Sequence, residues 1–224
     1  MKGTQKDLRN GGLKTKGFLI VLSGPSGAGK NSVMNAVFPT IPNLKYSVSV
    51  TTRPPRVGEV HAVNYFFVSE EEFDKMLAAD LLLESATFVG YRYGTPKKYV
   101  YEQIEAGNAV IMDIDIQGAA QIKRKMPEAV LVFLLPPTPE ELSRRLRLRG
   151  SDSEEVIKRR LAKSREEVKH IVDYDYFIIN DDLNKAAEQL RQIILSEWCR
   201  VSRIDLDYLQ QIWKGGSDLE ATES

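Results

Sequence analysis

Residues Phe18 to Lys30 read Phe-Leu-Ile-Val-Leu-Ser-Gly-Pro-Ser-Gly-Ala-Gly-Lys, an apolar run that leads straight into a glycine-rich turn ending in lysine. A strand, such a turn and a helix-forming stretch are the layout of a phosphate-binding loop. Glycines let the backbone bend tightly and turn its N–H groups inward, where they and the positive end of the helix cradle a polyphosphate. Lys30 is expected to reach the β- and γ-phosphates. The segment therefore predicts a nucleoside triphosphate site formed by Gly24, Pro25, Ser26, Gly27, Ala28, Gly29, Lys30, Asn31 and Ser32.

Asn31 departs from this motif. The position after the lysine is normally Ser or Thr, whose hydroxyl helps to hold Mg²⁺. The amide oxygen of Asn31 is a hard neutral ligand on a longer side chain, and Ser32 lies roughly 100° further round the helix. We therefore expect Mg²⁺ as a cofactor held mainly by phosphates and water, with Asn31 as the one candidate for a direct protein ligand.

The composition is that of an ordinary globular protein of one or two domains, with 224 residues, 42% of them hydrophobic and 28% charged. Lys and Arg together number 31, as do Asp and Glu, so the zero formal net charge gives no general attraction to nucleic acid or anionic membranes. The single cysteine, Cys199, excludes an internal disulfide and favours a reducing, cytoplasmic location. The two histidines cannot form a metal cluster by themselves.

Both ends of the chain are expected to lie outside the fold. Residues 1–16 are expected to be a solvated arm, because the apolar run that follows them is too short for a signal peptide. No stretch approaches the ~20 apolar residues of a membrane helix. Residues 205–224 are interpreted as a C-terminal extension whose polar tail, from Gly215 onward, is expected to be disordered.

Several apolar runs predict strands, and most of them are continuous rather than alternating. Continuous runs are typical of strands buried on both faces, and the helical stretches between the later runs favour parallel pairing. The sequence thus predicts an α/β fold around a parallel sheet. The expected strands are Phe18–Leu22, Tyr46–Val50, Tyr65–Val68, Ala109–Ile114, Val130–Leu134 and Phe177–Ile179.

Capping sequences mark the starts of several helices. Ser69 with Glu72 is a capping box, and Thr138 is followed by a first-turn proline and by glutamates that complete a second box. A third helix is expected to begin in Ser-Asp-Ser-Glu, from Ser151, and to run toward about His170. The segment 185–204 is amphipathic and predicts a closing helix.

Two polar segments interrupt this framework. Residues 49–84 are loop-rich and aromatic, as in an inserted substrate region, and prolines there present Arg53 and Arg56 at low entropic cost. Arginine binds phosphate bidentately. Residues 144–165 are rich in arginine and, together with a phosphate loop, predict a lid that closes on phosphates. A surface turn and a solvated helix face are the alternative interpretations of these two segments.

The order of short motifs along the chain resembles the guanylate kinase family. Each motif alone is weak, but the ordered set is specific and spans roughly residues 17–198. After the phosphate loop come Thr-Thr-Arg-Pro-Pro-Arg-x-Gly-Glu from Thr51, Tyr-Phe-Phe-Val-Ser from Tyr65, Tyr-Gly-Thr-Pro from Tyr93, Asp-Ile-Asp-x-Gln-Gly from Asp113, Arg-Gly-x-Asp-Ser-Glu-Glu from Arg149 and Asn-Asp from Asn180.

The resemblance implies both a reaction and an architecture. The reaction is transfer of the γ-phosphoryl group of ATP to GMP, and by extension dGMP, in purine nucleotide metabolism. The architecture is that of the P-loop nucleoside monophosphate kinases, a parallel sheet flanked by helices. A domain over 17–204 would carry a GMP-binding region at about 49–96 and a helical lid at about 144–165.

The resemblance also implies roles for individual residues. In the family, paired arginines and tyrosines hold the acceptor phosphate, and a glutamate that matches Glu84 reads the N1–H and 2-amino donors of guanine, a face that adenine lacks. Lid arginines stabilise the transferring phosphates, and Asn180 lies where the family contacts the adenosine side of ATP. The expected GMP-binding residues are thus Ser49, Arg53, Arg56, Tyr65, Glu84, Tyr93, Thr95 and Asp113, and the expected catalytic residues are Lys30, Asp113, Arg149 and Arg160, with Arg145 as a weaker third lid candidate.

Two other functions fit part of this pattern. One is a non-catalytic interaction module of the same fold, against which Lys30 and the arginines argue. The other is a transferase with a sugar-phosphate acceptor, against which Glu84 and Tyr93 argue. The expected partners are small nucleotides rather than nucleic acid or membranes, and the oligomeric state is left open. Further departures from the family pattern are Ala62, Asn64, Tyr91, Arg92 and Leu148.

Overall fold

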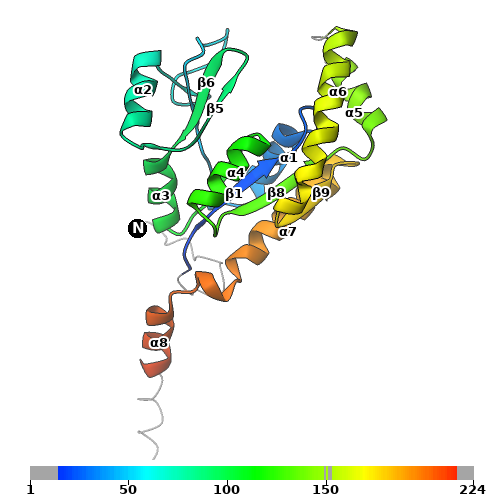
Figure 1. The fold of residues 1–224 in the computed structure, drawn as a ribbon. Coiled ribbons are helices and arrows are strands. Elements are labelled where there is room, and N and C mark those ends of the chain that lie inside the picture. Colours follow the sequence, from blue (N-terminus) through cyan, green and yellow to red (C-terminus); the bar gives the residue numbers. More distant parts are fainter. Residues whose placement is uncertain (1–14, 149, 151–152, 216–224) are drawn as a thin grey trace, which may run out of the picture.

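The computed structural model describes residues 15–148, 150 and 153–215. Within these ranges the chain forms a core sheet flanked by helices, a smaller second sheet, and a helical hairpin (Figure 1). The expectations for Arg149, for the arm up to residue 14 and for the tail from 216 lie outside the described residues.

The core sheet is parallel and has β1 at its centre. Its strand order is β2-β7-β1-β8-β9, and all of its pairings are parallel, as the continuous apolar runs predict. Its strands are β1 (Phe18–Ser23), β2 (Leu44–Tyr46), β7 (Ala109–Asp113), β8 (Val130–Leu135) and β9 (Tyr176–Ile179).

Side chains of β1 supply two separate apolar layers. Alternate residues of a strand point to opposite faces, so Phe18 and Ile20 join the cluster on one face while Leu19 and Val21 join the cluster on the other. All six residues of β1 are buried, and each large apolar side chain contributes about 1.5–3 kcal/mol by burial. This double burial fixes the strand that leads into the phosphate loop.

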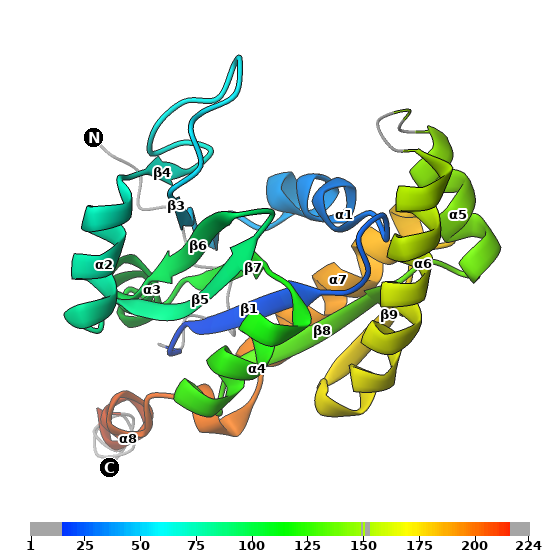
Figure 2. The same ribbon diagram turned by 45° about the horizontal axis from the view of Figure 1, so that its top comes forward.

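Helices cover both faces of the core sheet (Figure 2). The α1 and α7 helices pack on the Phe18 face, and α3 and α4 pack on the Leu19 face. The helices are α1 (Lys30–Val37), α3 (Lys97–Glu105), α4 (Ile116–Lys125) and α7 (Leu183–Trp198).

The second sheet rises from one end of the core sheet and has the order β4-β3-β6-β5 (Figure 2). Arg92 attaches helix α2 to it: the guanidinium donates to Asp74 at 2.6 Å and lies 4.5 Å from the ring centroid of Phe73. The Ser69 capping box of α2 is confirmed. The elements are β3 (Val50–Thr51), β4 (Phe66–Phe67), α2 (Glu70–Ala78), β5 (Leu82–Phe88) and β6 (Tyr91–Pro96).

A helical hairpin of α5 (Pro139–Leu148) and α6 (Glu154–Val168) stands at the other end of the core sheet (Figure 2). The Thr138 hydroxyl accepts a hydrogen bond from the N–H of Glu141, and Ser153 caps α6, close to where the capping sequences predict both starts. The two helices share a small apolar cluster made by Leu142, Leu146 and Ile157.

Two predicted elements are wrong in extent. The strand expected over 46–50 is interrupted after Tyr46, because the chain leaves the core sheet there and joins the second sheet as β3. The helix expected over 185–204 begins at Leu183 and ends at Trp198. It stops there because the chain turns back to place Arg203 against the buried Glu197, at 2.6 Å.

The residues beyond α7 tie the two ends of the described chain together. The Arg203 guanidinium lies 4.2 Å from the ring centroid of Phe18, and its carbonyl accepts from the N–H of Lys16 at 2.7 Å. Thr15 is buried and pairs with Ile204, so it is not part of a solvated arm. A last helix, α8 (Leu206–Gly215), follows. None of the described helices has the length and apolar character needed to cross a bilayer.

Candidate active site

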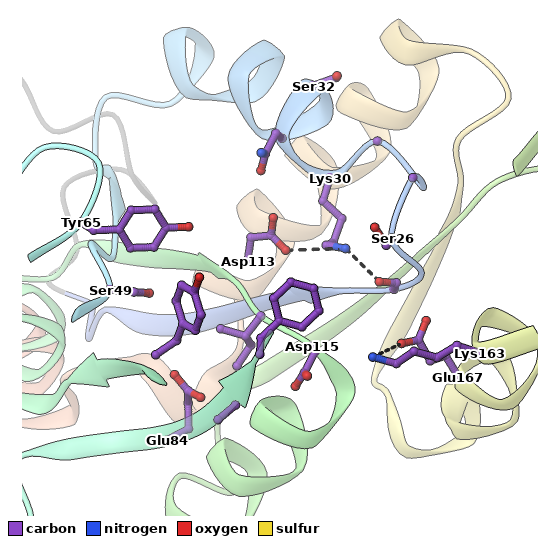
Figure 3. A pocket seen from close by; sticks show the side chains of 18 of the residues that line it. Ser26, Lys30, Ser32, Ser49, Tyr65, Glu84, Asp113, Asp115, Lys163 and Glu167 are labelled. Atoms are coloured by element: carbon purple, nitrogen blue, oxygen red, sulfur yellow. Dashed lines mark hydrogen bonds and ion pairs between the residues drawn. The ribbon is translucent and has the colours of Figure 1, made fainter. Parts of the chain in front are cut away.

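A cavity of about 520 Å³ opens at the carboxyl ends of β1 and β7, between α1, the second sheet and α6 (Figure 3). Ligands of open parallel sheets bind in this position. The cavity brings together twelve of the residues expected from the sequence. They are Gly24, Ser26, Gly27, Gly29, Lys30, Asn31, Ser32, Ser49, Tyr65, Glu84, Tyr93 and Asp113.

The loop after β1 has the backbone geometry of an anion cradle. Gly24 has a φ of +137°, and a Cβ there would lie 2.1 Å from the Leu134 carbonyl oxygen, so only glycine fits. Gly29, with a φ of +97°, is the N-cap of α1, and as a glycine it has no side chain with which to cap the helix. The first N–H groups of α1 are therefore left for a ligand, at the positive end of the helix dipole.

Lys30 is held at the floor of the cavity. Its ammonium donates to the Gly24 carbonyl at 2.8 Å and lies 3.7 Å from a carboxylate oxygen of Asp113 (Figure 3). Burial raises the pKa of Asp113, and the Lys30 charge opposes that rise. The pair places a fixed cation beside a carboxylate at the end of β7.

Glu84 is a buried carboxylate on the second sheet, with 4% of its surface exposed. The Thr95 hydroxyl donates to its Oε1 atom at 2.7 Å. Burial raises the pKa of Glu84 to about 7, although the Thr95 hydrogen bond opposes the rise. The rings of Tyr65 and Tyr93, 6.0 Å apart, line the same part of the cavity.

The paired arginines, Arg53 and Arg56, do not line the cavity. Arg53 is buried and donates to both carboxylate oxygens of Glu59, each at 2.9 Å, while its guanidinium lies 5.5 Å from the ring centroid of Tyr65. Arg56 is exposed, and its backbone N–H donates to Glu59. The ring of Tyr65 thus separates Arg53 from the cavity. Arg56 lies on the loop between β3 and β4, which we call the rim loop.

Asn180 and Arg145 support the phosphate loop from behind. The Asn180 side chain donates to the Ala28 carbonyl at 2.8 Å, and the Arg145 guanidinium donates to the Asn180 carbonyl at 2.8 Å. Neither lines the cavity. Their contacts fix the loop against β9 and α5, whereas a direct contact with ATP stays a prediction.

Comparison with known proteins identifies the family. A family model described as guanylate kinase matches residues 16–197. The chain belongs to the guanylate kinase family. The guanylate kinase of Caldanaerobacter subterraneus subsp. tengcongensis is 49% identical over 191 residues, 85% of this chain and 93% of that protein. The guanylate kinase of Desulfitobacterium hafniense is 49% identical over 187 residues, 84% of this chain and 94% of that protein.

A solved guanylate kinase shares this fold. The crystal structure of guanylate kinase from Anaplasma phagocytophilum is 33% identical and superposes with a TM-score of 0.69, covering 85% of this chain and 91% of that one. The predicted α/β class with a parallel sheet flanked by helices is confirmed. The family match includes the core sheet, the second sheet and the α5–α6 hairpin.

Several cavity residues of this guanylate kinase family member were not expected from the sequence. Asp115 follows Asp113 by two residues at the end of β7, so its place in the Asp-x-Asp motif was an available signal. Lys163 lies one helical turn after Arg160 inside the arginine-rich segment, but the sequence could not tell which face of the helix turns inward. The other unexpected lining residues are Tyr46, Ala86, Phe88, Ile114 and Glu167.

The donor atoms on the cavity wall suit Mg²⁺ bound mainly through substrate. Among the described residues, no group of three or more His, Cys, Asp or Glu side chains is placed to hold a metal ion. Asp113, Asp115 and Asn31 nevertheless offer hard oxygen donors there. Mg²⁺ commonly uses one or two carboxylates together with phosphate oxygens and water. The residues present therefore fit this cation.

Proposed function

We propose that this protein transfers the γ-phosphoryl group of ATP to GMP, giving ADP and GDP. The observation that carries the proposal is the single cavity that joins a phosphate loop, with Lys30 at its floor, to the buried carboxylate of Glu84. Membership of the guanylate kinase family supports the same reaction.

Glu84 would select guanine as the acceptor base. An ionised carboxylate accepts hydrogen bonds only, and guanine offers the N1–H and the 2-amino group as adjacent donors. The Thr95 hydroxyl donates to Oε1 of Glu84, which uses part of the hydrogen-bonding capacity of that atom and orients the carboxylate toward the cavity. Adenine lacks that donor face, so it would leave a buried carboxylate without partners at a large cost.

The acceptor phosphate would lie among hydroxyl and guanidinium groups of the second sheet. Ser49, Tyr65 and Tyr93 line that part of the cavity. Arg53 stacks beside Tyr65 and could exchange one hydrogen bond with Glu59 for one with phosphate. Arg56 on the rim loop would add a second guanidinium. These roles are the ones that the family resemblance assigns.

The reaction itself needs positioning and positive charge. The transferring phosphoryl group spreads negative charge over its oxygens, so a fixed cation lowers the barrier without covalent chemistry. Lys30 and the loop N–H groups would hold the donor phosphates, and the GMP phosphate would attack directly, in line. Mg²⁺, held by phosphates with Asp113 and Asn31 near it, would supply further positive charge. Arg149 and Arg160 are the lid arginines assigned to the same task.

The proposal extends to the organisation of the chain. Residues 17–204 would be the catalytic domain, with 49–96 binding GMP, 144–165 acting as the lid and 205–224 as an extension. The lone cysteine supports a cytoplasmic location. Small nucleotides would be the partners, with no role for nucleic acid or a membrane.

A coupled assay of ADP release, with ATP, Mg²⁺ and each nucleoside monophosphate in turn, tests this function. GMP should be the best acceptor, dGMP weaker, and AMP poorer by up to about 10⁴ in kcat/KM. Comparable values for AMP and GMP would overturn the role of Glu84. No turnover with any nucleotide would favour the non-catalytic module.

A further inference from the structure

Lys163 is a cavity-lining cation with no role in the reaction described above. It lies on α6, and its ammonium is 3.6 Å from a carboxylate oxygen of Glu167, one turn further along the helix. The Lys163 side chain is 59% exposed, while that of Glu167 is 10% exposed. A buried carboxylate therefore lies beside an accessible ammonium at the cavity wall.

The side of the cavity on which Lys163 lies indicates which substrate it meets. Figure 3 shows Lys163 and Glu167 on the side of Ser26 in the phosphate loop, across the cavity from Tyr65, Ser49 and Glu84. Burial raises the pKa of Glu167, and the charges of Lys163 and Lys30 oppose that rise. Lys163 thus faces the donor half of the site.

The charge on the cavity wall leaves room for another cation. Among the described lining residues, four are carboxylates and only Lys30 and Lys163 are cationic. Lys30 already donates to the carbonyl of Gly24 and lies near Asp113. A triphosphate in this cavity would meet a wall with an excess of negative charge, so a second ammonium, supplied by α6, has a specific electrostatic task. The lining carboxylates are Glu84, Asp113, Asp115 and Glu167.

We propose that Lys163 binds the phosphate chain of ATP from the α6 side, in addition to Lys30, with Glu167 as the positioning residue that keeps its ammonium over the cavity. This inference rests on the proposed function, because it takes ATP as the donor. The packing of α6 supports it: Ile157, Ser164 and Glu167 are its buried residues, and Ile157 packs with α5, which fixes the rotation of the helix. The packing of α6 therefore fixes the face of the helix on which Lys163 lies.

The test is a titration of wild type and three variants with a non-hydrolysable β,γ-imido analogue of ATP, in the absence of GMP. Lys163→Ala should weaken binding by about tenfold, the loss expected for one charge-assisted hydrogen bond to phosphate. Lys163→Arg keeps the charge and should bind within about threefold of wild type. Lys158→Ala removes an exposed lysine of α6 that does not line the cavity, and should bind as wild type does.

Steady-state kinetics give the second readout. Lys163→Ala should raise the KM for ATP by about tenfold and leave the KM for GMP within about twofold of wild type. Equal binding by Lys163→Ala and wild type, or an equal loss for ATP and GMP, would overturn the assignment. Absence of GMP phosphorylation by wild type would instead overturn the proposed function, since the analogue titration does not depend on turnover.

Discussion

At the scale of single residues, Glu84 combines two properties that normally conflict. It must be ionised to accept from guanine, yet burial raises its pKa to about 7. The Thr95 hydroxyl lowers that pKa only in part. Below about pH 7 the free site therefore carries a protonated carboxyl, whose O–H is a donor where an acceptor is needed.

We therefore expect the KM for GMP to depend on pH through Glu84. Because the ionised form binds guanine, the KM should be constant above about pH 8 and rise by about tenfold at pH 6. The measurement is a pH series of initial rates at saturating ATP. The phosphate of GMP also titrates near pH 6, so Glu84→Gln serves as the control. That variant should bind GMP more weakly but with a flatter profile, and an equal slope in both proteins would contradict the expectation.

At the scale of elements, the β5–β6 hairpin carries an unfavourable backbone conformation. Its two-residue turn consists of Val89, with a φ of 49°, and Gly90, with a φ of 78°. Turns with two positive φ angles prefer Asn-Gly, and a β-branched residue is strained in this region. Val89 is also 76% exposed, so it gains little from packing. The turn thus costs stability in the element that carries Glu84 and Tyr93.

Val89→Asn should stabilise the protein. Relief of the left-handed strain should add about 1 kcal/mol to the free energy of unfolding and raise Tm by about 2–4 °C. Thermal unfolding followed by circular dichroism measures the change. Val172→Asn is the matched control, because Val172 is also exposed but has no positive φ. A Tm for Val89→Asn that is equal to or below that of wild type would show that the turn is not strained.

Elements could be predicted from the sequence where one physical signal dominates. Phe18–Ser23 is buried on both faces and reads as one apolar run, and the glycines of the loop after it have positive φ angles that other residues rarely adopt. Strand β5 gives no such signal, because it starts with two buried leucines, then turns Glu84 inward, and has a register shift between Leu82 and Ser85. Its identity depends on pairing with β6, a tertiary contact that no local pattern encodes.

The same limit applies to the site. The loop residues line the cavity as their motif indicates, because the loop follows β1, whose position in the core sheet is fixed, while Glu84 lines the cavity from within β5. Lys163 could not be predicted, since its inward position depends on how α6 packs against α5. Arg53 shows the opposite case: its type and spacing suit phosphate, but in the fold one terminal nitrogen of its guanidinium donates to both Glu59 oxygens and the other donates to the Pro54 carbonyl.

At the scale of the whole molecule, the cavity is built from three bodies. The core sheet and helix α1, which packs on it, supply Asp113 and Lys30, the second sheet supplies Glu84, and the α5–α6 hairpin supplies Lys163 (Figures 2 and 3). The second sheet and the hairpin stand at opposite ends of the core sheet. Two nucleotides bound between the second sheet and the hairpin would place their phosphates where cations from both could contact them. Arg53 would be one of these cations, because it lies just behind the cavity wall.

Binding of both nucleotides should therefore bring the second sheet toward α6. Val57 is fully exposed on the loop between β3 and β4, and Lys158 lies on the exposed side of α6, so cysteines there can carry a dye pair. The background needs Cys199→Ser, since Cys199 is an exposed cysteine. Energy transfer should increase most with GMP and the β,γ-imido ATP analogue together, less with either alone, because only the pair supplies phosphates to both bodies. AMP in place of GMP should give only the response to the analogue, since it does not satisfy Glu84. If the transfer efficiency stays constant with both ligands at saturation, the second sheet does not move toward α6 and the three bodies form a rigid site. Arg53 would then not be brought from Glu59 to the acceptor phosphate.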